Sequence, residues 1–300
     1  MSYAGVGDEA GDDLDDQLDA IRRLGWDTVE LRTVGGVAVA DLDDRAFAAL
    51  AATVSARGIE VVCVASQIGN WSRLVTGDPA RDLDELACLA ERCRTLGTRF
   101  VRVMSYRNDG LDDAEWGRRA VARLRELALR AEQAGLVLLH ENCTGWAAVD
   151  PRRMLELVDA VGSPALGLMF DTGNGLAYGY DAHDILPDIV DHVRHVHVKD
   201  ARGARGAPSY EPPGVGGARV ADSLRLLLES GYAGAFAIEP HVVVRPHEAT
   251  GAGAPDGSGA GPRRAGFLAC GAALEELVRR EVAGPGWTPV PGGIARECPR

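Results

Sequence analysis

Short apolar runs and longer amphipathic stretches alternate along almost the whole chain. Runs such as 60–65 and 100–105 have the length and composition of buried strands, and stretches such as 44–57 and 114–134 repeat their apolar residues at helical spacing. Glycines supply helix stop signals before several of the strands, at Gly25, Gly58, Gly135 and Gly231. The alternation predicts eight strands and eight helices, which is typical of a parallel α/β barrel.

Four of the predicted strands end in a residue that can bind a metal ion. These strands end at Glu141, Asp171, His197 and Glu239. Apolar residues precede each ligand and a loop follows it, so each lies at the carboxyl end of its strand, which is the catalytic face of a parallel barrel. Each intervening segment is long enough for one crossover helix, and we therefore expect the four side chains to converge.

The same segments carry short motifs in a fixed order. They read Glu-Asn-Cys at 141–143, Phe-Asp-Thr-Gly-Asn at 170–174, His-Val-His-Val-Lys-Asp at 195–200 and Ile-Glu-Pro at 238–240. With this order and spacing, the chain resembles the xylose-isomerase-like TIM-barrel superfamily of sugar phosphate isomerases and epimerases. The resemblance covers the chain and implies a single (β/α)8 barrel with one divalent ion, usually Mn²⁺. It also implies the ligands Glu141, Asp171, His197 and Glu239.

The types of these four residues suit a site for a divalent metal ion. Three carboxylates and one imidazole suit Mn²⁺ or Mg²⁺ better than a thiolate-rich zinc site would, although Co²⁺ and Zn²⁺ are alternatives. A divalent ion would bind adjacent oxygens of a ketose and stabilise an enediolate. Proton removal then needs a base and proton return needs an acid, and we predict Glu141 and Glu239 for these two roles. Return to the same carbon gives epimerisation, and return to its neighbour gives isomerisation.

Other residues near the predicted barrel mouth are candidates for substrate binding. Lys199 shares a strand face with His197 and lies one step further up the mouth, where it either binds a substrate oxygen or is a surface lysine. Glu30 matches a strand-two glutamate common in the superfamily and either touches substrate or orients polar groups near the barrel floor. His195 also faces the interior, where we expect a packed, hydrogen-bonded role.

Two tryptophans and two asparagines complete the candidates. Trp71 and Trp146 follow strands and either wall a sugar pocket or pack on neighbouring loops. Asn142 and Asn174 lie beside ligands and are candidates for orienting them or for contacting substrate. Asn174 also replaces a histidine that contacts substrate in the ketose 3-epimerases, and the superfamily's DNA-repair endonucleases need histidines that this chain lacks before His140.

Three functions are compatible with the sequence. The first is a divalent-metal-dependent isomerase or epimerase acting on a ketose or sugar-like polyol. The second is a lyase of the inosose dehydratase type acting on a keto-polyol or keto-glycoside, in which proton abstraction is followed by loss of a β-hydroxyl. The third is a non-catalytic sugar-binding barrel, which the intact set of four ligands disfavours.

Composition narrows the partners and the domain organisation. The formal net charge of −12 opposes binding to nucleic acid, no apolar run is long enough for a membrane span, and homo-oligomer formation stays open. The six cysteines include no Cys-x-x-Cys pair, and the N-terminus lacks the features of a signal peptide, so we predict free thiols and a cytoplasmic location. We predict one barrel domain over 1–283 with a glycine-rich insertion at 250–262, followed by an irregular tail over 284–300.

Overall fold

The computed structural model describes residues 1–204, 206–243 and 260–297, and strands and helices alternate along them. The strands of the barrel sheet are β1 (Tyr3–Gly5), β2 (Thr28–Leu31), β5 (Glu60–Ala65), β6 (Phe100–Ser105), β7 (Val137–Gly145), β8 (Leu166–Asp171), β9 (Val193–Val198) and β12 (Phe236–Ile238). The α-helices are α1 (Leu14–Arg23), α2 (Asp44–Ala56), α3 (Ala80–Leu96), α4 (Asp113–Gln133), α5 (Pro151–Val161), α6 (Asn174–Tyr178), α7 (Ala182–Ile189), α8 (Val220–Glu229) and α9 (Ala260–Leu277).

The described residues also contain short hairpins and single helical turns. The hairpins are β3 (Thr33–Val34) with β4 (Val37–Ala38), β10 (Asp200–Ala204) with β11 (Ala207–Glu211), and β13 (Trp287–Val290) with β14 (Gly293–Arg296). Single turns of 3-10 helix cover Gly7–Glu9, Val39–Asp41 and Val190–His192, and a π-helical turn covers Val278–Val282. None of the helices in the described residues combines the length and apolar character needed to cross a membrane.

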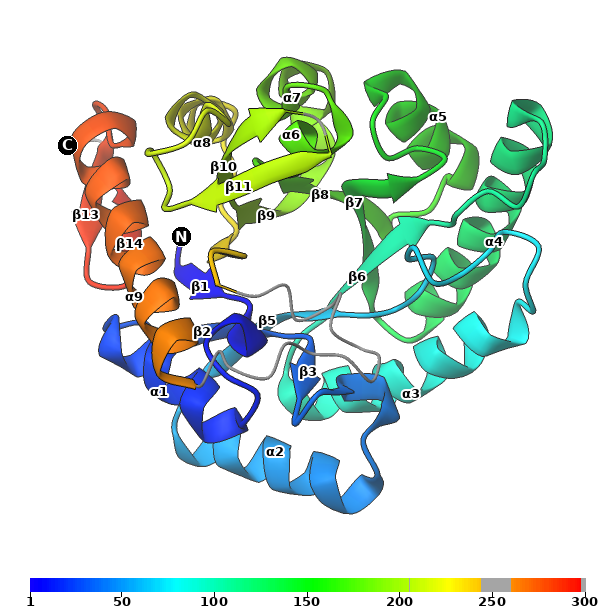
Figure 1. Ribbon diagram of the computed structural model, residues 1–300. Coiled ribbons are helices and arrows are strands. Elements are labelled where there is room, and N and C mark those ends of the chain that lie inside the picture. Colours follow the sequence, from blue (N-terminus) through cyan, green and yellow to red (C-terminus); the bar gives the residue numbers. More distant parts are fainter. Residues whose placement is uncertain (205, 244–259, 298–300) are drawn as a thin grey trace.

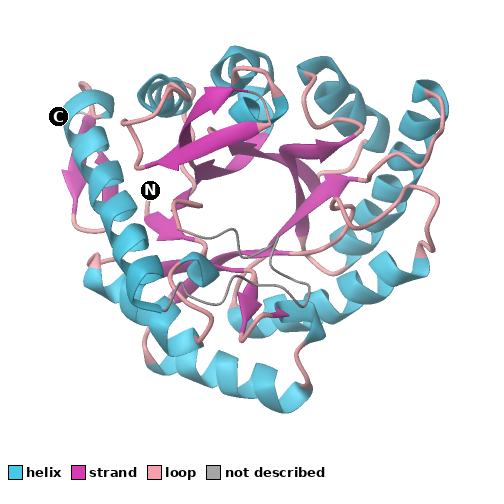
Figure 2. Ribbon diagram, in the orientation of Figure 1, coloured by secondary structure: helices cyan, strands magenta, loops and turns pink. Residues whose placement is uncertain are grey.

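Eight parallel strands form the central sheet in the order β1-β12-β9-β8-β7-β6-β5-β2, and helices surround it (Figures 1 and 2). The two ends of this order meet at a seam. There Val6 and Glu30 form an isolated parallel bridge, and the Thr28 hydroxyl donates a hydrogen bond to the carbonyl of Tyr3 at 2.5 Å. The sheet is therefore a nearly closed barrel, and the predicted (β/α)8 fold is confirmed.

Local sequence signals set the helix boundaries. The carboxylates of Asp43 and Asp112 accept hydrogen bonds from backbone N–H groups in the first turns of α2 and α4, at 2.7 and 2.9 Å. Asp150 does the same for α5, where Pro151 occupies the first turn. The four glycines predicted as helix stops all have positive φ angles of 59° to 84°.

The alternation of side chains along each strand separates two apolar regions. Outward-facing residues such as Val101 and Leu138 join the large core between the strands and the helices. Inward-facing Leu139 and Met169 pack with Cys63 in a smaller cluster. Because Glu141 and Asp171 come two residues after Leu139 and Met169, they share the interior face and lie one layer nearer the mouth.

Two predicted segments differ from expectation. In place of an irregular tail over 284–300, the described residues contain the hairpin β13–β14, whose Ile294 is buried. This hairpin pairs with the start of the chain, because the Tyr3 N–H donates to Gly292 at 2.8 Å and the Ile294 N–H donates to Met1 at 3.1 Å. Such long-range pairing leaves little local signal in the sequence.

The glycine-rich insertion predicted over 250–262 lies mostly outside the described residues. Its last three residues, 260–262, belong to α9 and so are helical. The short helix α6, directly after β8, is an addition to the eight predicted helices.

Candidate active site

The four side chains predicted as metal ligands come together at one mouth of the barrel, although β7 continues past Glu141 to Gly145 in place of ending there as predicted. β7, β8 and β9 deliver Glu141, Asp171 and His197, and Glu239 follows β12 directly. All four residues are buried, and one donor atom from each lies within 4.8 Å of those of the other three. The strand order β12-β9-β8-β7 puts the two glutamates on the outer flanks of the group, with His197 and Asp171 between them.

Two buried atoms in this group mark a place for a cation. His197 Nδ1 lies 3.5 Å from Glu239, 3.6 Å from Glu141 and 3.9 Å from Asp171. His197 Nδ1 has no hydrogen-bond partner among the described residues, and Asp171 Oδ2 meets only a cation, the Lys199 ammonium group at 2.9 Å. Unsatisfied buried donors and acceptors are rare in native proteins. Three carboxylates and one imidazole nitrogen are suitable ligands for a divalent ion, so the residues present fit one.

Glu30 lies beneath His197 and contacts its imidazole ring. Its Oε2 atom lies 2.7 Å from His195 Nε2 and 2.9 Å from His197 Nε2. If His197 donates its Nε2 proton to Glu30, its Nδ1 lone pair faces the three carboxylates, as a metal ligand requires. Glu30 is not among the described residues that line the neighbouring cavity, and its two histidine contacts fit the second of its predicted roles, the orientation of polar groups.

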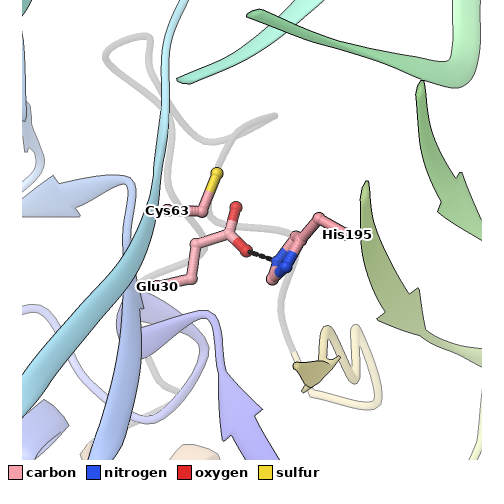
Figure 3. A group of neighbouring side chains, drawn as sticks. All are labelled: Glu30, Cys63 and His195. Atoms are coloured by element: carbon pink, nitrogen blue, oxygen red, sulfur yellow. Dashed lines mark hydrogen bonds and ion pairs between the residues drawn. The ribbon is translucent and has the colours of Figure 1, made fainter. Parts of the chain in front are cut away.

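Figure 3 shows Glu30 pointing between Cys63 and His195, which come from β5 and β9. Burial alone would raise the pKa of Glu30, but His197 and His195 lower it far below its usual range. Glu30 is therefore a permanent carboxylate beneath the ligand group. His195 has the interior, hydrogen-bonded position expected for it.

Three buried cations neutralise the carboxylates of the group. Lys199 Nζ forms ion pairs with Glu239 at 2.5 Å and with Asp171 at 2.9 Å, so it is no surface lysine. Arg102 Nη1 donates to Glu141 at 3.1 Å. Arg32 donates to the other oxygen of Glu239. Each of these cations holds a carboxylate in a defined orientation.

The pKa values of the ligands respond to this crowding of charges. Burial alone would raise the pKa of Glu239, but Lys199, His241 and His197 lower it well below its usual range. Burial likewise opposes the lowering of the Glu141 pKa by His197 and Arg102. Asp171 differs, because burial raises its pKa against the attraction of Lys199. Burial disfavours the charged form of His197, yet Glu30, Glu141 and Glu239 raise its pKa well above the usual range.

A cavity of about 210 Å³ opens onto this group. Among the substrate-binding candidates, Lys199, Trp71 and Asn174 line it together with Glu141 and Glu239. The Asn174 amide links two of these walls, because it donates to Glu141 and accepts from Lys199, both at 3.1 Å. The cavity has the mixture of aromatic and polar walls that suits a small polyol.

Two other candidates face away from the cavity. Asn142 donates from its amide to the Asp171 carbonyl at 2.9 Å and accepts from the Asp171 N–H at 2.6 Å, so it fixes the end of β8. Trp146 is buried against Gly117 of α4, and Arg153 lies over its ring. Neither is among the described residues that line the cavity.

Sequence reasoning gave no role to several residues at the site. Arg102 lines the cavity, and so do Cys143, Tyr178, Tyr210 and His241. Two of them carry a recognisable signal, because Arg102 has the inward register of a buried strand and His241 comes two residues after Glu239. Tyr210 carries none, since the hairpin β10–β11 brings it against His241, with ring centroids 5.1 Å apart.

Sequence relatives include an epimerase and inosose dehydratases. The chain is 33% identical over 174 residues to a 2-epi-5-epi-valiolone 7-phosphate 2-epimerase from Actinoplanes sp., covering 57% of this chain and 61% of the epimerase. It is 30% identical over 92 residues to an inosose dehydratase from Clostridium perfringens, covering 31% of each. The chain thus spans less than two thirds of either relative.

Solved structures share the fold over nearly the whole chain. The IOLI protein with a bound zinc atom has a TM-score of 0.73 at 17% identity, covering 95% of this chain and all 100% of the other. D-allulose 3-epimerase from Methylomonas sp., in complex with D-allulose, has a TM-score of 0.69 at 17% identity, covering 93% of this chain and 97% of the other. At these identities the likeness concerns the fold.

The family itself follows from the sequence. Residues 18–256 match the family described as xylose isomerase-like TIM barrel, and this range includes all four residues that converge at the mouth. Since the match extends over most of the chain and the barrel is present, the chain belongs to the xylose isomerase-like TIM barrel family.

Proposed function

We propose that this protein is a divalent-metal-dependent isomerase or epimerase that moves a proton next to the carbonyl of a ketose or sugar-like polyol. The observation that carries the proposal is the position of Glu141 and Glu239. They flank His197 and Asp171 from opposite sides, and both line the same cavity. A substrate in that cavity would present its reacting carbons to two carboxylates at once.

Glu141, Asp171, His197 and Glu239 would hold the metal ion, and we propose Mn²⁺ because the ligands are mostly oxygen atoms. When bound, the ion would polarise neighbouring substrate oxygens and so make the adjacent C–H group more acidic. A small carbohydrate as substrate is supported by the similarity to a 2-epi-5-epi-valiolone 7-phosphate 2-epimerase and by the shared fold of the D-allulose 3-epimerase that binds D-allulose. A cytoplasmic location and a homo-oligomeric state also stay predictions.

The residues around the cavity would divide the proton transfer between them. One glutamate takes the proton from carbon, and the other returns a proton to the same carbon or to its neighbour. Lys199 would donate a hydrogen bond to the substrate oxygen on which negative charge develops, because its ammonium group already lies among the cavity-lining carboxylates. Arg102 and Asn174 hold Glu141 in place during the transfer.

A dehydratase is the second candidate, favoured by the match to inosose dehydratases. It would use the same proton abstraction and then need an acid beside the leaving hydroxyl. The Tyr178 hydroxyl and the Lys199 ammonium group line the cavity and are the groups available for that step. Analysis of the product distinguishes the two candidates, since a dehydratase releases water and an epimerase does not.

Solvent deuterium exchange tests the proposal. We expect the Mn²⁺-loaded protein to wash deuterium from D2O into one or more members of a panel of ketoses and inososes, followed by NMR. Glu141→Gln and Glu239→Gln should each slow exchange by roughly 10²-fold or more, because glutamine cannot accept the proton. Glu229→Gln, at an exposed position at the end of α8, is the matched control and should exchange like the wild type.

Metal content is measured in the same samples, because either substitution at the site also weakens a ligand. Full exchange by both variants with the metal still bound would exclude the acid/base assignment. Exchange that is equal with and without metal would exclude a metal-dependent reaction.

A further inference from the structure

Glu239 belongs to two groups of ligand-type side chains. The first is the group already described, with Glu141, Asp171 and His197. The second contains Glu9, Glu239 and His241, whose donor atoms also lie within 4.8 Å of one another. Both groups are buried, and they occupy opposite sides of the Glu239 carboxylate.

The guanidinium group of Arg32 lies among the carboxylates of the second group and also contacts the neighbouring Asp8. Arg32 Nη2 lies 2.7 Å from Glu9 Oε1 and 2.7 Å from Asp8 Oδ1. Arg32 Nε donates to Asp8 Oδ2 at 3.0 Å, and Nη1 donates to Glu239 Oε1. Only 6% of the Arg32 side chain is exposed, and the three carboxylates are equally inaccessible.

The buried carboxylates of Asp8, Glu9 and Glu239 require a cation beside them. Three buried carboxylates without one would be strongly unfavourable, and a guanidinium group stays charged at every accessible pH. The same oxygen atoms, with the nearby His241 imidazole, would otherwise suit a divalent ion. We propose that Arg32 takes the place of a second metal ion and thereby keeps the centre mononuclear. This inference rests on the proposed function, in which the first group binds one ion.

Arg32 also determines which oxygen of Glu239 is available to the first group. It holds Oε1, while Oε2 lies 3.5 Å from His197 Nδ1 and 2.5 Å from Lys199 Nζ. Glu239 therefore presents one oxygen to the proposed metal and cannot bridge two ions. In this arrangement Arg32 is a positioning residue for Glu239.

Titration with Mn²⁺ tests the proposal without any substrate. Bound metal is counted by elemental analysis after dialysis, and electron paramagnetic resonance detects coupling between neighbouring Mn²⁺ ions. We expect one uncoupled ion in the wild type and two coupled ions in Arg32→Met, which keeps much of the side-chain length but removes the charge. Arg32→Lys keeps a positive charge and should bind one ion.

The double variant Arg32→Met/Glu9→Gln should return to one ion, because it loses a ligand of the second site. A single ion in folded Arg32→Met, as judged by circular dichroism, would overturn the proposal. If Arg32→Met does not fold, the wild type still decides, since a second coupled ion at millimolar Mn²⁺ would overturn it and strict binding of one ion would support it. A wild type that binds no Mn²⁺ would instead contradict the metal dependence of the proposed function.

Discussion

Among single residues, Glu30 shows how a side chain outside the cavity can govern the chemistry inside it. One of its oxygens lies within hydrogen-bonding distance of the Nε2 atoms of both His195 and His197, and its low pKa keeps it charged. We expect Glu30→Gln to lower the affinity for the divalent ion by roughly 10- to 100-fold, because a neutral amide fixes the His197 tautomer less firmly. Competition with a fluorescent chelator measures this affinity.

The control for this substitution is Glu60→Gln, an exposed glutamate at the start of β5. It makes the same chemical change away from the histidines and should leave the affinity unchanged. An unaltered affinity in Glu30→Gln would show that His197 needs no support from Glu30.

At the residue scale, the place of a side chain in the barrel could be predicted from the sequence better than the side chains that it contacts. Glu141, Asp171, His197 and Glu239 were recognisable because an apolar run places its last residue at a known end of the barrel. The ion pairs of Arg32 and Arg102 were not, because each arginine pairs with a carboxylate from a distant strand, although the inward register of Arg102 was visible. The sequence contains both members of each ion pair, but it does not show that they lie close together.

Among the elements, the hairpin β10–β11 depends on the single carboxylate of Asp200. Its two oxygens accept hydrogen bonds from the backbone N–H groups of Ala201, Gly214, Gly216 and Ala218, at 2.9 to 3.0 Å. We expect Asp200→Asn to lower the free energy of unfolding by about 1–3 kcal/mol, because the amide nitrogen faces donors that then lack an acceptor. Urea denaturation measures the change.

The same substitution should raise the KM for the substrate identified by deuterium exchange, since β11 carries the cavity residue Tyr210. Asp188→Asn, at an exposed position in α7, is the control and should change neither quantity. Stability equal to the wild type in Asp200→Asn would mean that the loop is held by other contacts.

Elements with a strong local pattern were predicted well, and those without one were not. The long barrel strands and their helices carry apolar periodicity and capping residues such as Asp43 and Asp112. The hairpin β13–β14 contains Pro289 and is completed by pairing with the first residues of the chain, so its sequence resembles a loop. Contact between distant segments decided these cases.

For the whole molecule, buried thiols link stability to alkaline pH. Burial raises the pKa of Cys93 and of Cys270 from 9.0 to about 12. Between these values the unfolded thiol ionises while the folded thiol stays protonated, so its contribution to stability is complete below pH 9 and is lost as the pH rises towards 12. Over this range, ionisation of each thiol in the unfolded chain lowers the free energy of unfolding by up to about 1.4 kcal/mol per pH unit.

Comparison of the wild type with Cys270→Ala isolates one of these thiols. The variant should be less stable at pH 8, because it leaves a small cavity, and the difference should shrink as the pH rises from 9 to 11. Urea denaturation at several pH values measures it. A difference that is constant with pH would contradict the link.

The place of β1 in the barrel sheet also has a consequence for synthesis of the chain. β1 pairs with β12 in the sheet, and Ser2 pairs with Gly293, so β1 has to wait until these much later parts of the chain have been made. A ribosome adds ~5–20 residues per second, so the roughly 230 residues between β1 and β12 take on the order of 10 to 50 seconds. During that time the unpaired edges of the growing sheet are open to other chains. Slow folding or a high concentration of growing chains should therefore lower the yield of this protein. The chains that do fold should still reach the same structure.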